Sequence, residues 1–159
     1  ENERIRLANE KVALENAAAA KKIEDDKAEV DAQKISNIKD LPDGYNKVTI
    51  EGGMFYDGEI LEGAIDGKGI MIWPDSSSYS GVWRSNMRQG RGTMKWKNGI
   101  VYMGMFKHDE INGKGTMTYS DGHKYAGSFK DGVPHGSGKF IYPDGKIIKC
   151  KHIEGKLLD

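Results

Sequence analysis

Apolar and polar residues alternate along the second part of this chain. Residues 79–83, YSGVW, place Tyr79 and Trp83 on one face of an extended strand, because successive side chains of a strand point to opposite sides. Residues 90–96, GRGTMKW, alternate in the same way. The pattern predicts two β-strands, each with one apolar face, joined by the polar residues 84–89.

The same pattern recurs with a period of 23 residues, which separates four tyrosines: Tyr56, Tyr79, Tyr102 and Tyr125. Asn-Gly or Asp-Gly steps close three of the units, at residues 97–99, 120–122 and 143–145. Because glycine tolerates positive φ, such steps are typical of hairpin turns, and each unit is predicted to be a β-hairpin. A fixed period of this length indicates a repeat fold whose units bury their apolar faces against one another.

Paired glycines keep the same step along the chain. We expect them to let aromatic rings lie over bare backbone of the adjacent strand. One pair lies in Gly113–Thr116, which looks like the end of a phosphate-binding loop. The first glycine of that motif is replaced by His108, and Lys114 is followed by Gly115 instead of Ser or Thr. Since the pair recurs with the period, we interpret these glycines as architecture and expect no nucleotide cofactor.

Three consecutive units carry a family resemblance. The segments YSGVWRSNMRQGRGTMKWKNG, YMGMFKHDEINGKGTMTYSDG and YAGSFKDGVPHGSGKFIYPDG resemble the MORN (membrane occupation and recognition nexus) repeat. The preceding unit departs from the motif, with Ile60 at the aromatic position and Ser76 at the closing glycine. The resemblance implies a scaffold that binds partner helices or pairs with itself, and such arrays have also been proposed to bind phospholipids.

The predicted fold is therefore mainly β: a single-layer elongated array of antiparallel β-hairpins, preceded by a long N-terminal α-helix. The array is expected to occupy residues 41–159. Its predicted parts are a half-unit at 43–55, units at 56–78, 79–101, 102–124 and 125–147, and a degenerate cap at 148–159.

The N-terminal residues 1–40 are rich in Ala, Glu and Lys and contain neither Gly nor Pro, which favours a long helix. A thin apolar stripe runs along it at helical spacing, from Ile5 to Val30. Three roles stay open for this helix. The first role is an exposed part of a longer rod, the second is a helix that pairs with a partner or with itself, and the third is a helix that packs on the repeats of its own chain.

The aromatic face of the array is the candidate protein-binding site. In the structural interpretation these rings are a core that packs ring on ring between units. In the functional interpretation they line a groove for a helical segment. The candidate groove residues are Tyr79, Trp83, Met94, Trp96, Tyr102, Phe106, Met117, Tyr119, Tyr125, Phe129 and Tyr142.

A basic cluster is the second candidate site. Residues 76–108 contain no Asp or Glu. The candidate residues for anionic lipid or an acidic partner are Arg84, Arg88, Arg91, Lys95 and Lys97. Four of them, all but Arg88, alternate away from the rings and are expected on the opposite face. The alternatives are a solvated face and neutralisation by the acidic run 24–31 of this chain.

Catalytic and metal chemistry find no support in the sequence. The four histidines lack metal-ligand spacing, His135 fills the histidine position of the repeat motif, and the single cysteine, Cys150, replaces a repeat glycine. We therefore expect no enzyme activity, no metal and no cofactor. The 24 basic and 24 acidic residues cancel, so the net charge does not favour nucleic acid, and we expect no nucleic-acid partner.

We expect no membrane-spanning segment and no signal peptide in this sequence. No apolar run approaches the roughly 18–20 residues that span a bilayer, and the charged start is unlike a signal peptide. The missing initiator Met suggests a piece of a longer polypeptide. We expect a cytoplasmic protein associated with cytoskeleton or membrane, and the resemblance adds cilia or flagella as settings.

Overall fold

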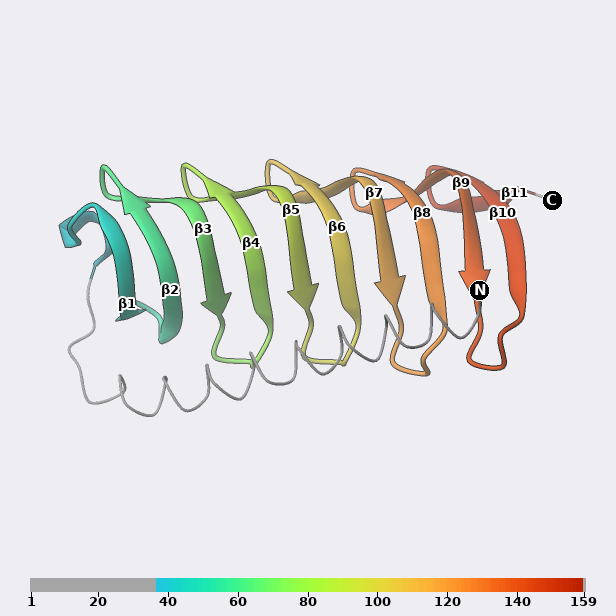
Figure 1. Ribbon diagram of the computed structural model, residues 1–159, viewed down its shortest axis with the longest axis horizontal. Helices are drawn as coiled ribbons and strands as arrows, with labels where there is room; N and C mark the ends of the chain where they lie inside the picture. Colours follow the sequence, from blue (N-terminus) through green and yellow to red (C-terminus); the bar gives the residue numbers. More distant parts are fainter. Residues whose placement is uncertain (1–36, 159) are drawn as a thin grey trace. The chain divides into compact units, whose positions relative to one another are not determined.

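The computed structural model describes residues 37–158, and this part of the chain forms one antiparallel sheet. Its 11 strands lie in sequence order, each paired with the next (Figure 1). A 3-10 helix, Ile38–Asp40, precedes them. The strands are β1 (Gly44–Ile50), β2 (Met54–Leu61), β3 (Ala64–Ile72), β4 (Ser78–Arg84), β5 (Met87–Lys95), β6 (Val101–Lys107), β7 (Glu110–Thr118), β8 (Lys124–Lys130), β9 (Val133–Ile141), β10 (Ile147–Ile153) and β11 (Lys156–Leu158).

Each 23-residue unit contributes one hairpin to this sheet. The hairpin of β4 and β5, for example, lies within residues 79–101 except for its first residue, Ser78. The predicted single-layer array of antiparallel hairpins is thereby confirmed for the described residues. The hairpin turns lie along one long side of the sheet and the loops between units along the other (Figure 1).

The turn within each hairpin has two residues with positive φ, as in a type I′ turn. Ser85 and Asn86 form one of these turns, with φ of 48° and 68°. This corrects the prediction that all of residues 84–89 connect the strands. A two-residue turn of this type matches the strand twist, so Arg84 still belongs to β4 and β5 already begins at Met87.

The loops between units contain the Asn-Gly and Asp-Gly steps. After β5 the amide of Gly99, whose φ is +84°, donates to the carbonyl of Trp96 at 3.0 Å. The amide of Trp96 donates to the carbonyl of Ile100 at 2.9 Å. These steps therefore join antiparallel strands, as predicted.

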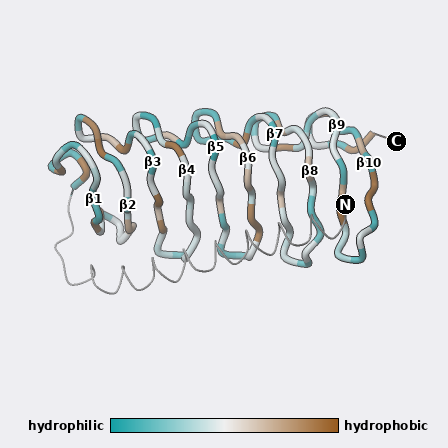
Figure 2. The backbone as a smooth tube through the Cα atoms, in the orientation of Figure 1, coloured by the Kyte–Doolittle hydropathy of each residue, from teal (hydrophilic) through white to brown (hydrophobic). Residues whose placement is uncertain are grey.

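A row of glycines crosses the sheet. Gly81 of β4 is paired with Gly92 of β5, which is paired with Gly104 of β6, and the row continues to both sides. The register shifts just after this row within each hairpin, for example between Gly81 and Trp83. Hydrophobic and hydrophilic residues are mixed along the strands, as expected for a sheet that buries one face (Figure 2). We call the face that carries Tyr56, Tyr79, Tyr102 and Tyr125 the ring face, and the opposite one the outer face.

The predicted N-terminal helix lies almost wholly outside the described residues. Of residues 1–40, the structure describes only the last four. Asn37 has extended dihedral angles, φ −84° and ψ 133°, and its side chain caps the short helix Ile38–Asp40 by accepting from the amide of Lys39. A continuous α-helix therefore does not reach residue 40.

Candidate functional site on the ring face

Each tyrosine of the ring face lies over two glycines. The hydroxyl of Tyr102 donates to the carbonyl of Met105 at 3.1 Å, which turns the ring along its own strand. A Cβ atom added at Gly104 would lie 2.3 Å from the hydroxyl of Tyr102, and one added at Gly115 would lie 2.4 Å from it. The glycines are thus required by the rings, and the prediction that rings lie over bare backbone is confirmed.

The rings form a continuous chain from unit to unit. Phe106 packs edge-on against Tyr79 of the preceding unit at 5.0 Å and against Tyr102 of its own unit at 5.3 Å. Phe129 repeats this arrangement one unit later, at 5.2 Å from Tyr102 and 5.3 Å from Tyr125. Edge-to-face contacts of this kind contribute about 0.5–1.5 kcal/mol each beyond burial. The ring face is therefore the core that couples the units.

Seven of the eleven candidate groove residues belong to this core. Each is at most 6% exposed: Tyr79, Trp83, Met94, Tyr102, Phe106, Tyr125 and Phe129. A partner cannot touch them unless the packing between units opens. For these seven the interpretation as core replaces the predicted groove, because neighbouring units and hairpin ends cover the rings.

The other four candidates are not fully buried. Tyr142 is 36% exposed, whereas Trp96, Met117 and Tyr119 are half-buried and pack against the core. With Trp73, three of them make a series at the 23-residue step, just beyond the ends of β3, β5, β7 and β9. We call Trp73, Trp96, Tyr119 and Tyr142 the rim row. His123 stacks on Tyr119 with ring centroids 4.2 Å apart and extends this apolar edge toward Tyr142. The structure thus leaves a band of aromatic surface beside the buried rings.

The rim row ends in a hollow of about 580 Å³ near the start of the sheet. Ile38, Met54 and Trp73 contribute partly buried apolar walls, and Trp83 and Arg88 also line it. Sequence reasoning left out Ile38 and Met54, since both precede the first complete unit. Their only sequence signal is an apolar residue on either side of β1.

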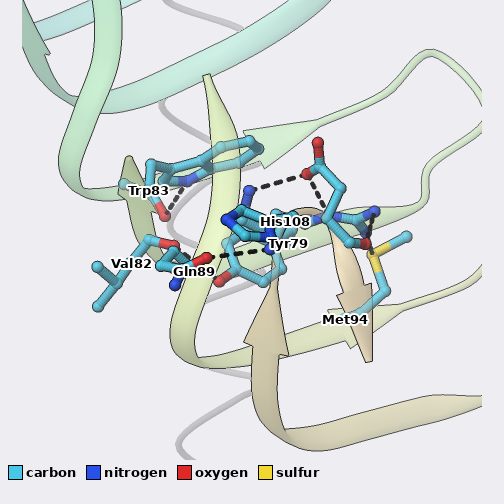
Figure 3. A network of polar contacts seen from close by, with 9 residues as sticks. Tyr79, Val82, Trp83, Gln89, Met94 and His108 are labelled. Atoms are coloured by element: carbon cyan, nitrogen blue, oxygen red, sulfur yellow. Dashed lines mark hydrogen bonds and ion pairs between the residues drawn. The ribbon is translucent and has the colours of Figure 1, made fainter. Parts of the chain in front are cut away.

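Arg88 lies on the ring face and not with the other basic candidates. Its guanidinium carbon is 5.8 Å from the ring centre of Tyr79 and 5.4 Å from that of Phe106. It donates to a carboxylate oxygen of Asp109 at 3.1 Å and to the carbonyl oxygen of Asp109 at 2.7 Å. Figure 3 shows Met94 beside this network. Arg88 is thus a contact between units and no part of a lipid-facing surface.

The remaining basic candidates split into different environments. Arg84 forms an ion pair with Asp66 at 3.4 Å, and Lys97 lies in the loop between β5 and β6. Arg91 and Lys95 point to the outer face of β5 and are exposed. The five predicted residues therefore do not form one patch, because Arg88 lies on the ring face and Lys97 lies beyond the end of β5.

The family assignment follows from the repeat itself. The MORN repeat profile matches four consecutive segments, residues 56–78, 79–101, 102–124 and 125–147, which are the four predicted units. Together they cover more than half of the chain. The chain belongs to the MORN repeat family.

Other comparisons add little to this assignment. No curated protein matches the chain. A similar solved structure is the SAS-4 (dCPAP) TCP domain of Drosophila melanogaster, in complex with a proline-rich motif of Ana2 (dSTIL). It is 13% identical, with a TM-score of 0.37, and covers 65% of this chain and 69% of that chain. This likeness is too weak to carry an argument about the MORN array.

A second series of side chains, also spaced by 23 residues, contacts each hairpin turn from the preceding unit. His135 accepts from the amide of Glu154 through Nδ1 at 3.3 Å. Gln89, which lies two repeats before His135, accepts from the amide of His108 at 3.0 Å (Figure 3). Sequence reasoning recognised only His135, as the motif histidine. The series at 43, 66, 89, 112 and 135 varies in type: Asp43, Asp66, Gln89, Asn112 and His135.

Burial changes the acidity of the core tyrosines. It raises the pKa of Tyr79 to about 12 and that of Tyr102 to about 12, because the charged phenolate would lose its hydration. Burial likewise holds the pKa of Tyr56 well above its ordinary value. These hydroxyls are thus neutral structural donors in the MORN core.

Two further features concern metals and membranes. No group of three or more His, Cys, Asp or Glu side chains in residues 37–158 is arranged to hold a metal ion. The same part of the chain contains no helix long and apolar enough to cross a bilayer.

Proposed function

We propose that this MORN array is a non-catalytic scaffold whose rim row holds a helical segment of a partner protein. The proposal is supported by one observation above all. Trp73, Trp96, Tyr119 and Tyr142 form an aromatic band along the edge of the core, and each keeps part of its surface exposed. Aromatic side chains of this kind are the residues that most often anchor protein interfaces.

The spacing of the rim row favours a helix that lies across the strands. Successive members of the row are two strands apart, which corresponds to about 10 Å. Residues seven apart on a helix are separated by about 10.5 Å along its axis. A helix with apolar residues at every seventh position would therefore place one anchor on each unit.

The hollow near the start of the sheet supports a larger anchor at one end of such a helix. Met54 and Trp73 offer partly buried apolar surface, and the ion pair of Arg88 with Asp109 forms a polar margin. Sites of this composition accept a large apolar side chain next to a polar one. A partner helix would thus have a fixed direction along the row.

The test uses a designed peptide with leucine at every seventh position, titrated into the full chain. All three tryptophans lie on the ring face or its rim, so their fluorescence reports occupancy. We expect saturable binding in the micromolar range, and a loss of at least about tenfold when Trp96 and Tyr119 are both replaced by Ala.

A matched control lies on the outer face. Met103 is 42% exposed, so Met103→Ala removes exposed apolar surface without touching the row. The proposal fails if Met103→Ala weakens the peptide as much as the double variant does. It also fails if a peptide with its leucines rearranged binds equally well.

A second candidate function is contact with anionic membrane lipid through the outer face. It is supported by exposed cations such as Arg91, Lys95 and Lys139 on that face. Such contacts are screened by salt and lost with the charges. Together with the rim row, this surface would suit a cytoplasmic adaptor between cytoskeleton and membrane, with cilia and flagella as settings to examine.

A further inference from the structure

The outer face carries a hollow of its own. It measures about 640 Å³, and part of its lining comes from four glycines of the row: Gly92, Gly104, Gly115 and Gly127. The ring-face side of these glycines is filled by the tyrosines, so only their outer side is open. The glycine row thus serves the rings on one face and leaves a shallow channel on the other.

Side chains of neighbouring strands flank this channel in two rows. Arg91, paired with Met105, and Lys114, paired with Ser128, stand on one side. Thr93, which is paired with Met103, and Thr116 stand on the other. Ser137 completes the lining. The channel therefore carries two cations and four hydroxyl groups beside more extensive apolar surface, which includes two exposed methionines.

Among the residues that the structure describes, no acidic side chain lines the channel. Within β4 to β10 the strands contain one acidic residue, Glu110, at the start of β7. The other acidic residues of this part of the sheet lie in turns: Asp109, Asp121, Asp131, Asp144 and Glu154. Among residues 37–158, neither Arg91 nor Lys114 forms an ion pair. Within this part of the chain, no carboxylate therefore occupies either cation.

The dimensions of the channel fit an extended polypeptide. Arg91 on β5 and Lys114 on β7 are two strands apart, about 10 Å. This equals about one turn of an extended polyproline II chain, in which side chains three residues apart share a face. The lining spans β5 to β9, about 19 Å, or about six such residues. We propose that this outer channel binds an extended acidic segment of another protein, with carboxylates three residues apart on Arg91 and Lys114.

Two observations favour this occupant over others. A flat bilayer would meet the cations but leave the channel over the glycines empty. The lining contains no aromatic side chain, whereas single-stranded nucleic acid is held largely by stacking of its bases on aromatic rings. Met103 and Met105 instead offer adaptable apolar contact to the residues between the carboxylates. This inference concerns the face opposite the rim row and stands independently of the function proposed above.

The test titrates a fluorescent peptide with glutamate at every third position, and proline between, into the full chain. We expect saturable binding that weakens with salt. Replacing Arg91 and Lys114 by Gln should weaken it about tenfold, because two exposed charge pairs are lost. Replacing Lys95 and Lys139 by Gln removes the same charge from the same face outside the channel, and should change binding less than twofold.

A filling variant separates a channel from a merely charged surface. Thr116→Trp keeps every charge but occupies the channel, and tryptophan suits a strand position. It should abolish peptide binding while the melting temperature stays close to that of the parent chain. Phosphatidylserine vesicles serve as the second ligand.

The inference is overturned if the full chain does not bind the peptide. It is equally overturned if both double variants weaken the peptide alike, or if Thr116→Trp leaves it bound. Vesicle binding that falls equally in both double variants, together with absent peptide binding, would assign the face to membranes.

Discussion

The hydroxyl of Tyr102 and the carbonyl oxygen of Met105 are 3.1 Å apart, and this short link within one strand organises the unit. It holds the ring flat along β6, over Gly104 of its own strand and Gly115 of the next. The same link recurs from Tyr79 to Val82 at 3.0 Å. The hydrogen bond of the tyrosine hydroxyl therefore fixes the position of the ring, and the glycines leave the space that the ring occupies.

Gly104→Ala is expected to destabilise the sheet strongly. Its Cβ would lie 2.3 Å from the hydroxyl of Tyr102 and 2.6 Å from the Cα of Gly115, and the latter is backbone that cannot swing away. Overpacking of this kind costs about 3 kcal/mol at the upper end of its usual range. Chemical denaturation measures the loss. Gly145→Ala is the control, because nothing lies within 4 Å and only its φ of +87° opposes a side chain, at about 1 kcal/mol.

Stability is expected to fall as pH rises from about 10 to 12. In the unfolded chain a tyrosine has a pKa of about 10, whereas burial raises the pKa of Tyr79 to about 12 and that of Tyr102 to about 12. Between these values the unfolded state has lost protons that the folded state keeps, so unfolding becomes easier as pH rises. Below pH 10 this contribution is fully retained.

Alkaline titration monitored by phenolate absorbance and circular dichroism checks this prediction. The absorbance of the buried tyrosines and the loss of sheet signal should rise together. Replacing Tyr79 and Tyr102 by Phe should move the alkaline midpoint upward, although each lost hydrogen bond costs about 1 kcal/mol at neutral pH. Ionisation of the buried rings with the sheet intact would contradict the prediction.

The repeat and its ring positions could be predicted from the sequence because strand alternation and a fixed period are local patterns. The two-residue spacing of Tyr79, Gly81 and Trp83 is enough to predict that they share one face of a strand. The depth of burial could not be predicted in this way. It depends on contacts between units, such as Phe106 against Tyr79, which no single strand contains.

The position of Arg88 was missed for a related reason. Arg88 lies two residues before Gly90, so in β5 it shares the face of Gly90, Gly92 and Met94. The sequence pattern, however, predicted that the strand begins only at Gly90. The hairpin turn there consists of Ser85–Asn86, without the glycine that marks the equivalent turn at 131–132. Applying the period to the turns would have placed Arg88 on the ring face.

His135→Ala is expected to loosen the last hairpin. Its Nδ1 accepts from the amide of Glu154 at 3.3 Å, and alanine offers no acceptor. The loss should be about 1 kcal/mol, as for other backbone amides capped by side chains. His135→Asn should retain most of the stability, because the side-chain carbonyl oxygen of asparagine accepts from the same amide. Hydrogen exchange at Glu154 should speed up in the alanine variant and remain slow in the asparagine variant.

The pair of Arg88 and Asp109 is expected to couple neighbouring units by about 0.5–1 kcal/mol, since both side chains are partly exposed. A double-mutant cycle of Arg88→Ile and Asp109→Gly isolates this energy, because each replacement is native to the repeat. Ile65 and Ile111 stand where Arg88 does in adjacent units, and glycine at position 109 accepts its φ of 70°. Arg88→Ile should cost little alone, because well-packed apolar residues replace partly buried ion pairs without large losses. The coupling energy should shrink in high salt, and a value near zero at low salt would leave Arg88 as a packing residue only.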